Sequence, residues 1–503
     1  MTKYGTDKYS NFKYGLSATD NLLWAMEIDW DDDGIFDGQN EAMWAFYFQS
    51  TRGREFYIRP SADGFEVMPK GEAVIRLYND TGRYDPFNAA SPLYGMLSPG
   101  KKVRIQVKNG TAGENYPVFT GRLADITPYG RRGIVDLDIS DGWDFLHNAS
   151  PYVAIQTNIT ADDGIGAILD DINWPAIWGR SLDVGPDNIK YWWASKQNAK
   201  IAIEDLASSG MGYVFTARNG AFTYYSRHRI ADPVMTLTED ELLKDIAIPQ
   251  PWEFQRNIIN VQANPRVEQA LQVIWTLQEE KPLIGPGESY TVYPQYSYND
   301  ISVPAIDVVD PLLGTDYTFN AQEDDGGAAV ANTRTYDDFG ETGKLTILNT
   351  DIVSGYLTLA QVRGKPLEKP DVAGMRATGS GYLTDPKVFN LNLPWLQDTN
   401  TARDFTDFLA GFLSTSPIFP QGFIEDRPTI QFDLELFDDV TLDLATWGIN
   451  DVFRLSKITH KWLNKSGQLV STQLGFEPSF AVAADSVWIL GVSLLGVGTI
   501  MTW

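Results

Sequence analysis

The chain has 503 residues, of which 43% are hydrophobic and 13% aromatic, enough for several packed cores, and this excludes an intrinsically disordered protein. Its 66 acidic residues against 40 basic ones give a formal net charge of −26, which argues against binding to nucleic-acid phosphates. The absence of cysteine excludes disulfides, thiolate metal sites and thiol nucleophiles. Many glycines and prolines, with few long helical periods, predict a mainly β protein.

The N-terminal third of the chain reads as an arm followed by one β domain. Residues 1–20 are polar and predict an extended arm. Residues 21–146 contain about seven short strand-like runs, including 73–78, 103–107, 118–126 and 134–139. Their number and spacing predict a barrel or a sandwich.

An acidic turn between the first two strands carries the start of a calcium loop, D-x-D-x-D-G. Calcium takes six to eight oxygen ligands. The position that usually holds a bidentate glutamate is Asn40, with Glu41 one residue later, and the flanks look like strands, so a solvated acidic turn is the alternative. The candidate ligands, carboxylates except for the carbonyl of Ile35, are Asp29, Asp31, Asp33, Ile35 and Asp37.

Residues 79–100 form a connection of about 20 residues that contains three prolines and shows no helical or alternating pattern. A loop of this length inside a compact domain is usually functional or reaches a partner. We therefore expect it to project from the β domain. The side chains expected to pair across an interface are Asp80, Arg83, Tyr84 and Asp85.

Residues 151–250 change to a mixed α+β pattern. Thr160 begins a capping box for a helix with apolar residues at helical spacing. A second helix is expected from about Asn198 to Gly210, followed by a hairpin at Asn219-Gly220.

The C-terminal half predicts two further β regions. A strand at 257–263 opens the first, residues 268–385 read as a small inserted β domain, and residues 386–478 resume with a strand, a helix and three strands. In that helix, one stripe contains Phe405, Phe408, Leu409 and Phe412. The apolar stretch 487–503 is short for a membrane span and lacks a basic flank, so we expect a docking arm and no membrane anchor.

No catalytic site is indicated. His147, His228 and His460 share no motif, and the common nucleotide-binding, hydrolase and metalloprotease motifs are absent. Paired carboxylates and the tryptophans at 174, 178, 192 and 193 keep a carbohydrate-active or peptidoglycan-cleaving enzyme as one alternative. An adhesin that binds a host receptor through exposed Trp and Tyr is the other. The sequence predicts a protein that is not an enzyme, with calcium as the one candidate cofactor.

Several short sequence motifs occur in a characteristic order. They are N-D-x-G-R-Y-D-P-x-N, S-P-L-Y-G and P-G-x-x-V-R-I from residue 79, then F-T-G-R-L-x-D-I, D-G-W-D-F-L, N-I-I-N-V-Q-A, G-Y-L-T-L-A-Q-V-R-G and residues 443–462, with a terminal W-I-L-G-x-S-x-L-G arm. Over about residues 20–503 the chain thereby resembles the tail hub proteins of tailed bacteriophages, also called baseplate hub or minor tail proteins, and in particular those of siphophages.

The resemblance implies a mainly β (α+β) fold with two tail-tube-like β-barrel domains, an intervening α+β module and an additional β domain. The implied division is an N-terminal arm at 1–20, a first barrel at 21–150, the α+β module at 151–250, a second barrel at 251–267 and 386–478, the additional domain at 268–385, and an apolar arm at 479–503.

The resemblance also implies a function. Such a protein is a structural component of the virion, assembled in the host cytoplasm, that forms a homotrimer at the tail tip and closes the tail tube. Implied partners are the distal tail protein, the tape measure protein and tail fibre or receptor-binding proteins, while DNA passes without specific binding. In the apolar arm, Trp488, Ile489 and Leu490 are the expected partner contacts.

Overall fold

The computed structural model describes residues 22–479, except residues 37, 60–62, 111–114, 196, 230–231, 243, 278–280, 325, 371–372, 426 and 465–467. The predicted arm at 1–20 and residues 480–503, with Trp488, Ile489 and Leu490, lie outside this part. Strands make up 45% and helices 13%, which confirms the mainly β prediction. Within the described ranges, no helix combines the length and the hydrophobicity needed to cross a membrane.

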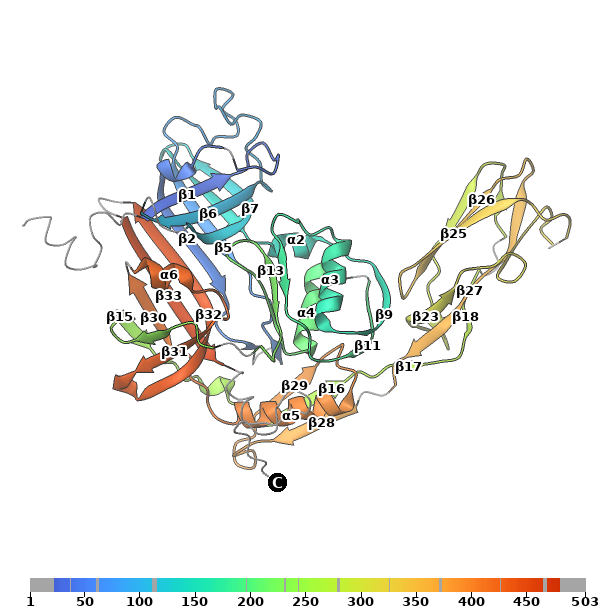
Figure 1. The fold of residues 1–503 in the computed structure, drawn as a ribbon. Coiled ribbons are helices and arrows are strands. Elements are labelled where there is room, and N and C mark those ends of the chain that lie inside the picture. The colour runs from blue at the N-terminus through green and yellow to red at the C-terminus, as the bar shows by residue number, and fades with distance from the viewer. Residues whose placement is uncertain are drawn as a thin grey trace, which may run out of the picture.

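A twelve-stranded sheet is the largest element of the fold (Figure 1). Its main path runs β1-β6-β7-β8-β5-β2-β32-β33-β30-β15, and β31 joins β32 and carries β14. Buried and more exposed residues alternate along strands such as β5, because successive side chains point to opposite faces. The first half comprises β1 (Leu22–Ile28), β2 (Ala45–Gly53), β5 (Glu72–Tyr78), β6 (Lys102–Asn109), β7 (Asn115–Tyr129) and β8 (Ile134–Ser140).

The second half continues the same sheet. Seven consecutive antiparallel pairs, from Tyr47↔Leu463 to Gly53↔Lys457, join β2 to β32. Among the described residues the strand pairings form an open path, and neither half closes into a barrel. The strands of this half are β14 (Thr236–Thr238), β15 (Lys244–Ala247), β30 (Gln421–Glu425), β31 (Asp439–Leu444), β32 (Ile449–Asn464) and β33 (Gln468–Pro478).

The α+β module lies beside the sheet. The capping box at Thr160 is present, with its N–H donating to Asp163 Oδ2 at 3.0 Å, and Asn198 Oδ1 caps the second helix at Ile201 N. Both predicted helices therefore begin where the sequence indicated. The elements are α2 (Trp143–Asn148), β9 (Val153–Ile159), α3 (Ala161–Asp171), β10 (Arg180–Leu182), β11 (Ile189–Ala194), α4 (Ala199–Ser209), β12 (Tyr213–Thr216) and β13 (Phe222–Tyr225).

A separate three-stranded sheet, ordered β28-β16-β29, packs against helix α5. The predicted second barrel is thus divided, because 258–263 pair with 373–378 and 388–392 and not with the twelve-stranded sheet. The helix stripe is confirmed in part, since Phe405 is buried and Phe408 and Phe412 are partly buried. The elements are β16 (Ile258–Ala263), β28 (Ala373–Thr378), β29 (Val388–Asn392) and α5 (Thr399–Leu413).

An additional β domain projects away from the rest of the molecule (Figure 1). Its long strand β27 pairs with β17, β18 and β19 and with β23 and β24, and a second sheet has the order β20-β26-β25. The strands are β17 (Val267–Glu268), β18 (Gln272–Thr276), β19 (Leu283–Ile284), β20 (Ser289–Val292), β21 (Ser297–Tyr298), β22 (Ile301–Ser302), β23 (Ala305–Val309), β24 (Tyr317–Asn320), β25 (Asn332–Asp338), β26 (Gly343–Asn349) and β27 (Gly355–Glu368).

Short elements complete the described chain. They are η1 (Glu41–Met43), β3 (Ile58–Arg59), β4 (Gly64–Phe65), η2 (Trp252–Phe254), α6 (Pro428–Asp433) and η3 (Ala445–Trp447).

A buried charged residue holds the modules together just beyond the end of β2. The Arg54 guanidinium pairs with Glu477 of β33 at 2.5 Å, and both side chains are 2% exposed. Its Cζ also lies 4.6–4.8 Å from the ring centroids of Tyr57, Tyr213 and Phe437. These contacts come from the first half, the α+β module and the second half, so one cation is shared by three parts of the fold.

Candidate functional site

Two loops at one end of the first half share a buried hydrogen-bond network. We call residues 29–40 the acidic loop and residues 79–100 the apical loop. Glu41, which follows the acidic loop and is fully buried, accepts hydrogen bonds from Trp30 Nε1 at 2.8 Å and from the Tyr84 hydroxyl. Arg83 Nη2 lies 3.7 Å from Glu41 Oε1. The carboxylate therefore connects the two loops inside the protein.

Burial dominates the electrostatics of this network. It raises the pKa of Glu41, and the hydrogen bonds from Tyr84 and Trp30 and the charge of Arg83 offset part of that increase. Burial, followed by the neighbouring Glu41 charge, also raises the pKa of Tyr84 far above its usual value. The Tyr84 hydroxyl consequently keeps its proton and acts as a donor to Glu41.

The apical loop is a folded segment, although its sequence shows no regular pattern. Its backbone makes successive i to i+3 hydrogen bonds at Gly82, Asp85, Asn88, Ser91 and Tyr94. The Asn79 side chain accepts from Tyr84 N at 2.9 Å. Tyr84 and Leu93 are buried in the core of the first half. A chain of turns and two apolar anchors therefore fix this loop on the sheet.

The four predicted contact residues differ in their exposure. Asp80 is exposed, Arg83 and Asp85 are half-buried, and Tyr84 is completely buried. The structure corrects the prediction for Tyr84, because its side chain points into the core and cannot reach a partner.

The apical loop instead exposes apolar side chains that the sequence reasoning did not select. Phe87 is 90% exposed, Tyr94 55% and Met96 39%. One fixed loop therefore presents three large apolar side chains to solvent. Sequence alone could not separate these three from the buried anchors, because no periodicity marks which side chains point inward.

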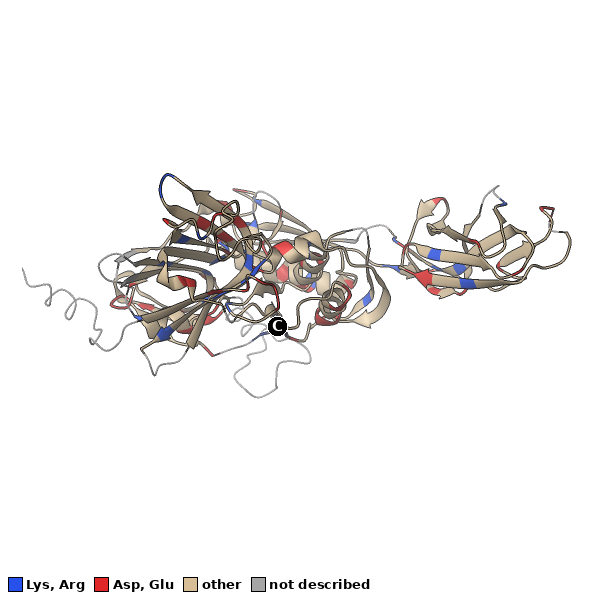
Figure 2. Ribbon diagram, turned by 90° about the horizontal axis from the view of Figure 1, so that it is seen from above, with Lys and Arg blue, Asp and Glu red and all other residues tan. Residues whose placement is uncertain are grey.

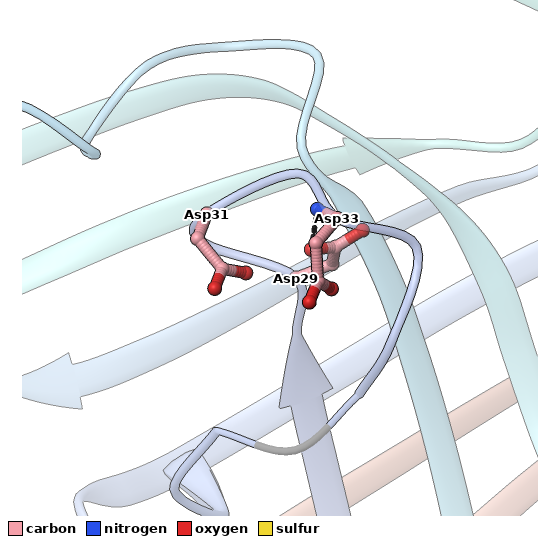
Figure 3. A group of neighbouring side chains, drawn as sticks. All are labelled: Asp29, Asp31 and Asp33. Atoms are coloured by element: carbon pink, nitrogen blue, oxygen red, sulfur yellow. Dashed lines mark hydrogen bonds between the residues drawn. The ribbon is translucent and has the colours of Figure 1, made fainter.

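The acidic loop gathers three of its predicted ligands. One carboxylate oxygen from each of Asp29, Asp31 and Asp33 lies within 4.8 Å of the other two. Figure 3 shows the three side chains in this loop. Asp29 is buried and already accepts from the backbone N–H of Asp33 at 3.1 Å and of Gly34 at 3.0 Å. Lys102 Nζ lies 3.2 Å from the same carboxylate. Asp29, the most buried of the three predicted ligands, is thus already hydrogen-bonded to the backbone and paired with a lysine.

The residues at the end of the acidic loop, where a calcium loop usually has its bidentate glutamate, make contacts within the protein. Asn40 Oδ1 accepts from the backbone N–H of Met26 and of Ala42, at 2.9 and 3.0 Å. The next carboxylate, Glu41, is directed into the core. Ile35 is exposed, and Asp37 lies outside the described residues.

The solvent side of the twelve-stranded sheet forms a second candidate surface. We define the polar face as Tyr47, Gln49, Thr51, Glu72, Arg76, Asp125, Asp136, Asp138, Lys457, Thr459, Lys461, Ser471 and Gln473, which share one side of the sheet by register. The ladder between β2 and β32 carries this face across both halves, and the Thr51 and Thr459 hydroxyls meet there at 3.2 Å. Figure 2 shows acidic and basic residues spread over the molecule.

Acidic groups crowd the first-half portion of the polar face. Partial burial, followed by the charges of Asp125, Asp136 and Glu72, raises the pKa of Asp138. The Arg76 guanidinium Nε lies 3.0 and 3.2 Å from the two oxygens of Asp136, so its charge is compensated. This part of the sheet presents net negative charge to solvent.

Four tryptophans and one histidine that the sequence offered for enzymatic chemistry are buried. Trp174, Trp178, Trp192 and Trp193 belong to the largest buried core and cannot serve as an exposed sugar platform. His460 is buried, with its Nδ1 2.9 Å from Thr472 Oγ1.

The sequence matches no family model and no curated protein. Two tail proteins are among the solved structures that share its fold. A tail protein from Neisseria meningitidis MC58 is 11% identical, with 92% of this chain and 99% of that chain covered and a TM-score of 0.50. The 43 kDa tail protein of prophage MuSo2 from Shewanella oneidensis is 9% identical, with the same coverage and a TM-score of 0.50. The predicted resemblance to phage tail proteins is confirmed at the level of the fold.

Proposed function

We propose that this chain is a structural protein of a phage virion, a homotrimeric tail-tip or baseplate hub that closes the tail tube. The observation that carries the proposal is the fold shared with two tail proteins over 92% of the chain. Residues that the sequence alternatives assigned to sugar binding are buried, which favours assembly over catalysis. The proposed partners are the distal tail protein, the tape measure protein and fibre or receptor-binding proteins.

The polar face is the surface that we assign to the passage of DNA. The first-half portion of this face repels phosphate, because its carboxylates are crowded and its arginine, Arg76, is already paired with Asp136. DNA would slide along such a surface without being held. At and beyond the join between the halves, Thr51, Thr459 and Gln473 offer hydrogen bonds. Of the two lysines in this portion, Lys457 lies 3.3 Å from Glu55 Oε1, and Lys461 lies over the Tyr47 ring at 6.0 Å from its centroid.

The apical loop is the surface that we assign to a neighbouring tail protein. Its anchors, Tyr84 and Leu93, keep Phe87 and Tyr94 in a defined position, so little conformational entropy is lost when a partner covers them. The side chains most suited to fill apolar pockets of a partner are thus already presented by a folded loop.

Oligomeric state and location test the proposal. Mass photometry of the purified chain should show trimers at micromolar concentration, and cryo-electron microscopy of assembled tails should place three copies at the tip. A protein that stays monomeric, together with tails whose tip contains no three-fold density for this chain, would refute the hub assignment.

A charge-reversal experiment tests the DNA path separately. Glu72→Lys with Asp125→Lys on the polar face should raise DNA retention in a low-salt filter-binding assay at least several-fold over the unchanged protein. The matched control is Glu323→Lys with Asp337→Lys, two exposed acidic positions on the projecting domain. Equal gains in both variants would show that net charge, and not the polar face, governs contact with DNA.

A further inference from the structure

The acidic loop contains its own cation. Lys102, the first residue of β6, has a side chain that is only 17% exposed, and its Nζ lies 3.2 Å from Asp29 Oδ2 and 3.5 Å from Asp32 Oδ1. The Asp29 side chain is fully buried at this contact. An ammonium group is therefore already paired with the buried Asp29 carboxylate, which a metal ion in this loop would have to coordinate.

The backbone of the loop places two of its carboxylates, those of Asp29 and Asp32, beside this lysine. Asp32 adopts a left-handed conformation with φ 62°, and Gly34 has φ 89°, so the chain reverses direction within a few residues. The two N–H groups that follow this turn, those of Asp33 and Gly34, donate to Asp29. Backbone dipoles and the lysine thereby compensate the buried negative charge.

The residues that would complete a calcium shell are used elsewhere. Asn40 is hydrogen-bonded to the backbone of Met26 and Ala42, and Glu41 to Trp30 and Tyr84. A divalent ion at Asp29 would also lie within a few ångströms of the Lys102 ammonium and would be repelled by it. Few protein oxygens remain for a cation that needs six to eight.

We propose that Lys102 replaces a metal ion in this loop, so that the loop keeps its shape without calcium. Removing the ammonium converts the loop into a site for a divalent or trivalent cation, held by Asp29, Asp31 and Asp33. Because Lys102 lies two residues after the end of the apical loop, this pair also fixes the chain where that loop returns to the sheet. The geometry of both loops is then independent of the calcium concentration in the surrounding solution.

Terbium binding to the full-length chain tests this proposal. Trp30 lies between Asp29 and Asp31 in the sequence, so its indole can sensitise the emission of Tb³⁺ bound in the loop. We expect no saturable loop-specific emission from the unchanged protein and at least a tenfold gain in Tb³⁺ affinity for Lys102→Met. Excess calcium should displace the terbium. Trp30→Phe in the Lys102→Met background should remove the emission, which assigns the signal to this loop.

Thermal unfolding with and without calcium provides the second readout. Lys102→Met should melt at a lower temperature in chelator and recover in calcium, while Lys102→Arg, which keeps a cation, and Lys108→Met, on the same strand but distant from the loop, should show no calcium response. Saturable binding of calcium at this loop in the unchanged protein overturns the proposal. A Lys102→Met protein that binds no better than the unchanged one also overturns it, and Lys102→Gln decides the question if the methionine variant does not fold.

Discussion

The buried contact between Tyr84 and Glu41 allows a quantitative prediction about the apical loop. Tyr84→Phe keeps the aromatic packing against Trp44, whose ring centroid is 6.2 Å away, and removes only the hydroxyl that donates to Glu41. Hydrogen bonds to charged groups contribute about 1.5–3 kcal/mol, and Arg83 at 3.7 Å compensates part of the loss. We expect the loop to be destabilised by about 2 kcal/mol.

Hydrogen exchange of the full-length protein measures this local change. About 2 kcal/mol corresponds to a roughly 30-fold loss of protection, since 1.4 kcal/mol is a factor of ten. The loss should appear at the loop amides that donate within the loop, such as those of Tyr84 and Asn88. It should be larger at pH 8 than at pH 5, because protonated Glu41, whose pKa is raised by burial, needs the donor less.

Tyr94→Phe is the matched control, since it removes the same hydroxyl from an exposed residue of the same loop. If both variants leave loop protection unchanged, or if protection falls equally in the projecting domain, the hydrogen bond does not hold the loop and the reasoning is wrong.

Three further predictions concern assembly, pH and the join between modules. Phe87→Ser should change the melting temperature by little, because the side chain is 90% exposed, yet lower the yield of assembled tails in a complementation assay. Burial lowers the pKa of His460 to about 3, so the neutral histidine stabilises the fold above pH 6.5 and this stabilisation is lost as the pH falls from 6.5 toward 3. In denaturant titrations, the free energy of unfolding should therefore fall between pH 7 and pH 5 by about 2 kcal/mol less in His460→Gln than in the unchanged protein. Arg54→Met should lower the free energy of unfolding by about 3–5 kcal/mol, because it leaves Glu477 buried and unpaired. The double variant Arg54→Met with Glu477→Gln should recover part of that loss, as measured by calorimetry.

Local chemistry explains which elements could be predicted from the sequence. The helices at Thr160 and Asn198 have side chains that satisfy free N–H groups in the first turn, so their starts are encoded within a few residues. The β character of the first half follows from alternation along strands such as β5. The spacing typical of a calcium loop correctly predicted that the side chains of Asp29, Asp31 and Asp33 lie close together.

Long-range pairing explains what could not be predicted. The strand at 258–263 alternates like the others, and only the folded chain shows that its partners are β28 and β29 and not the large sheet. Lys102 lies 73 residues from Asp29 in the sequence, so the internal cation of the acidic loop has no local signature. The inward direction of Tyr84 likewise depends on Glu41, 43 residues earlier.

The ladder between β2 and β32 has a mechanical consequence. Seven consecutive residue pairs, supported by the buried Arg54–Glu477 pair nearby, must break together before the two halves of one chain can separate. Each chain would then behave as one rigid segment of a ring. A channel formed by several such rigid chains would widen at the interfaces between chains. The force that opens a tail tip would then separate contacts between chains and leave the sheet of each chain intact.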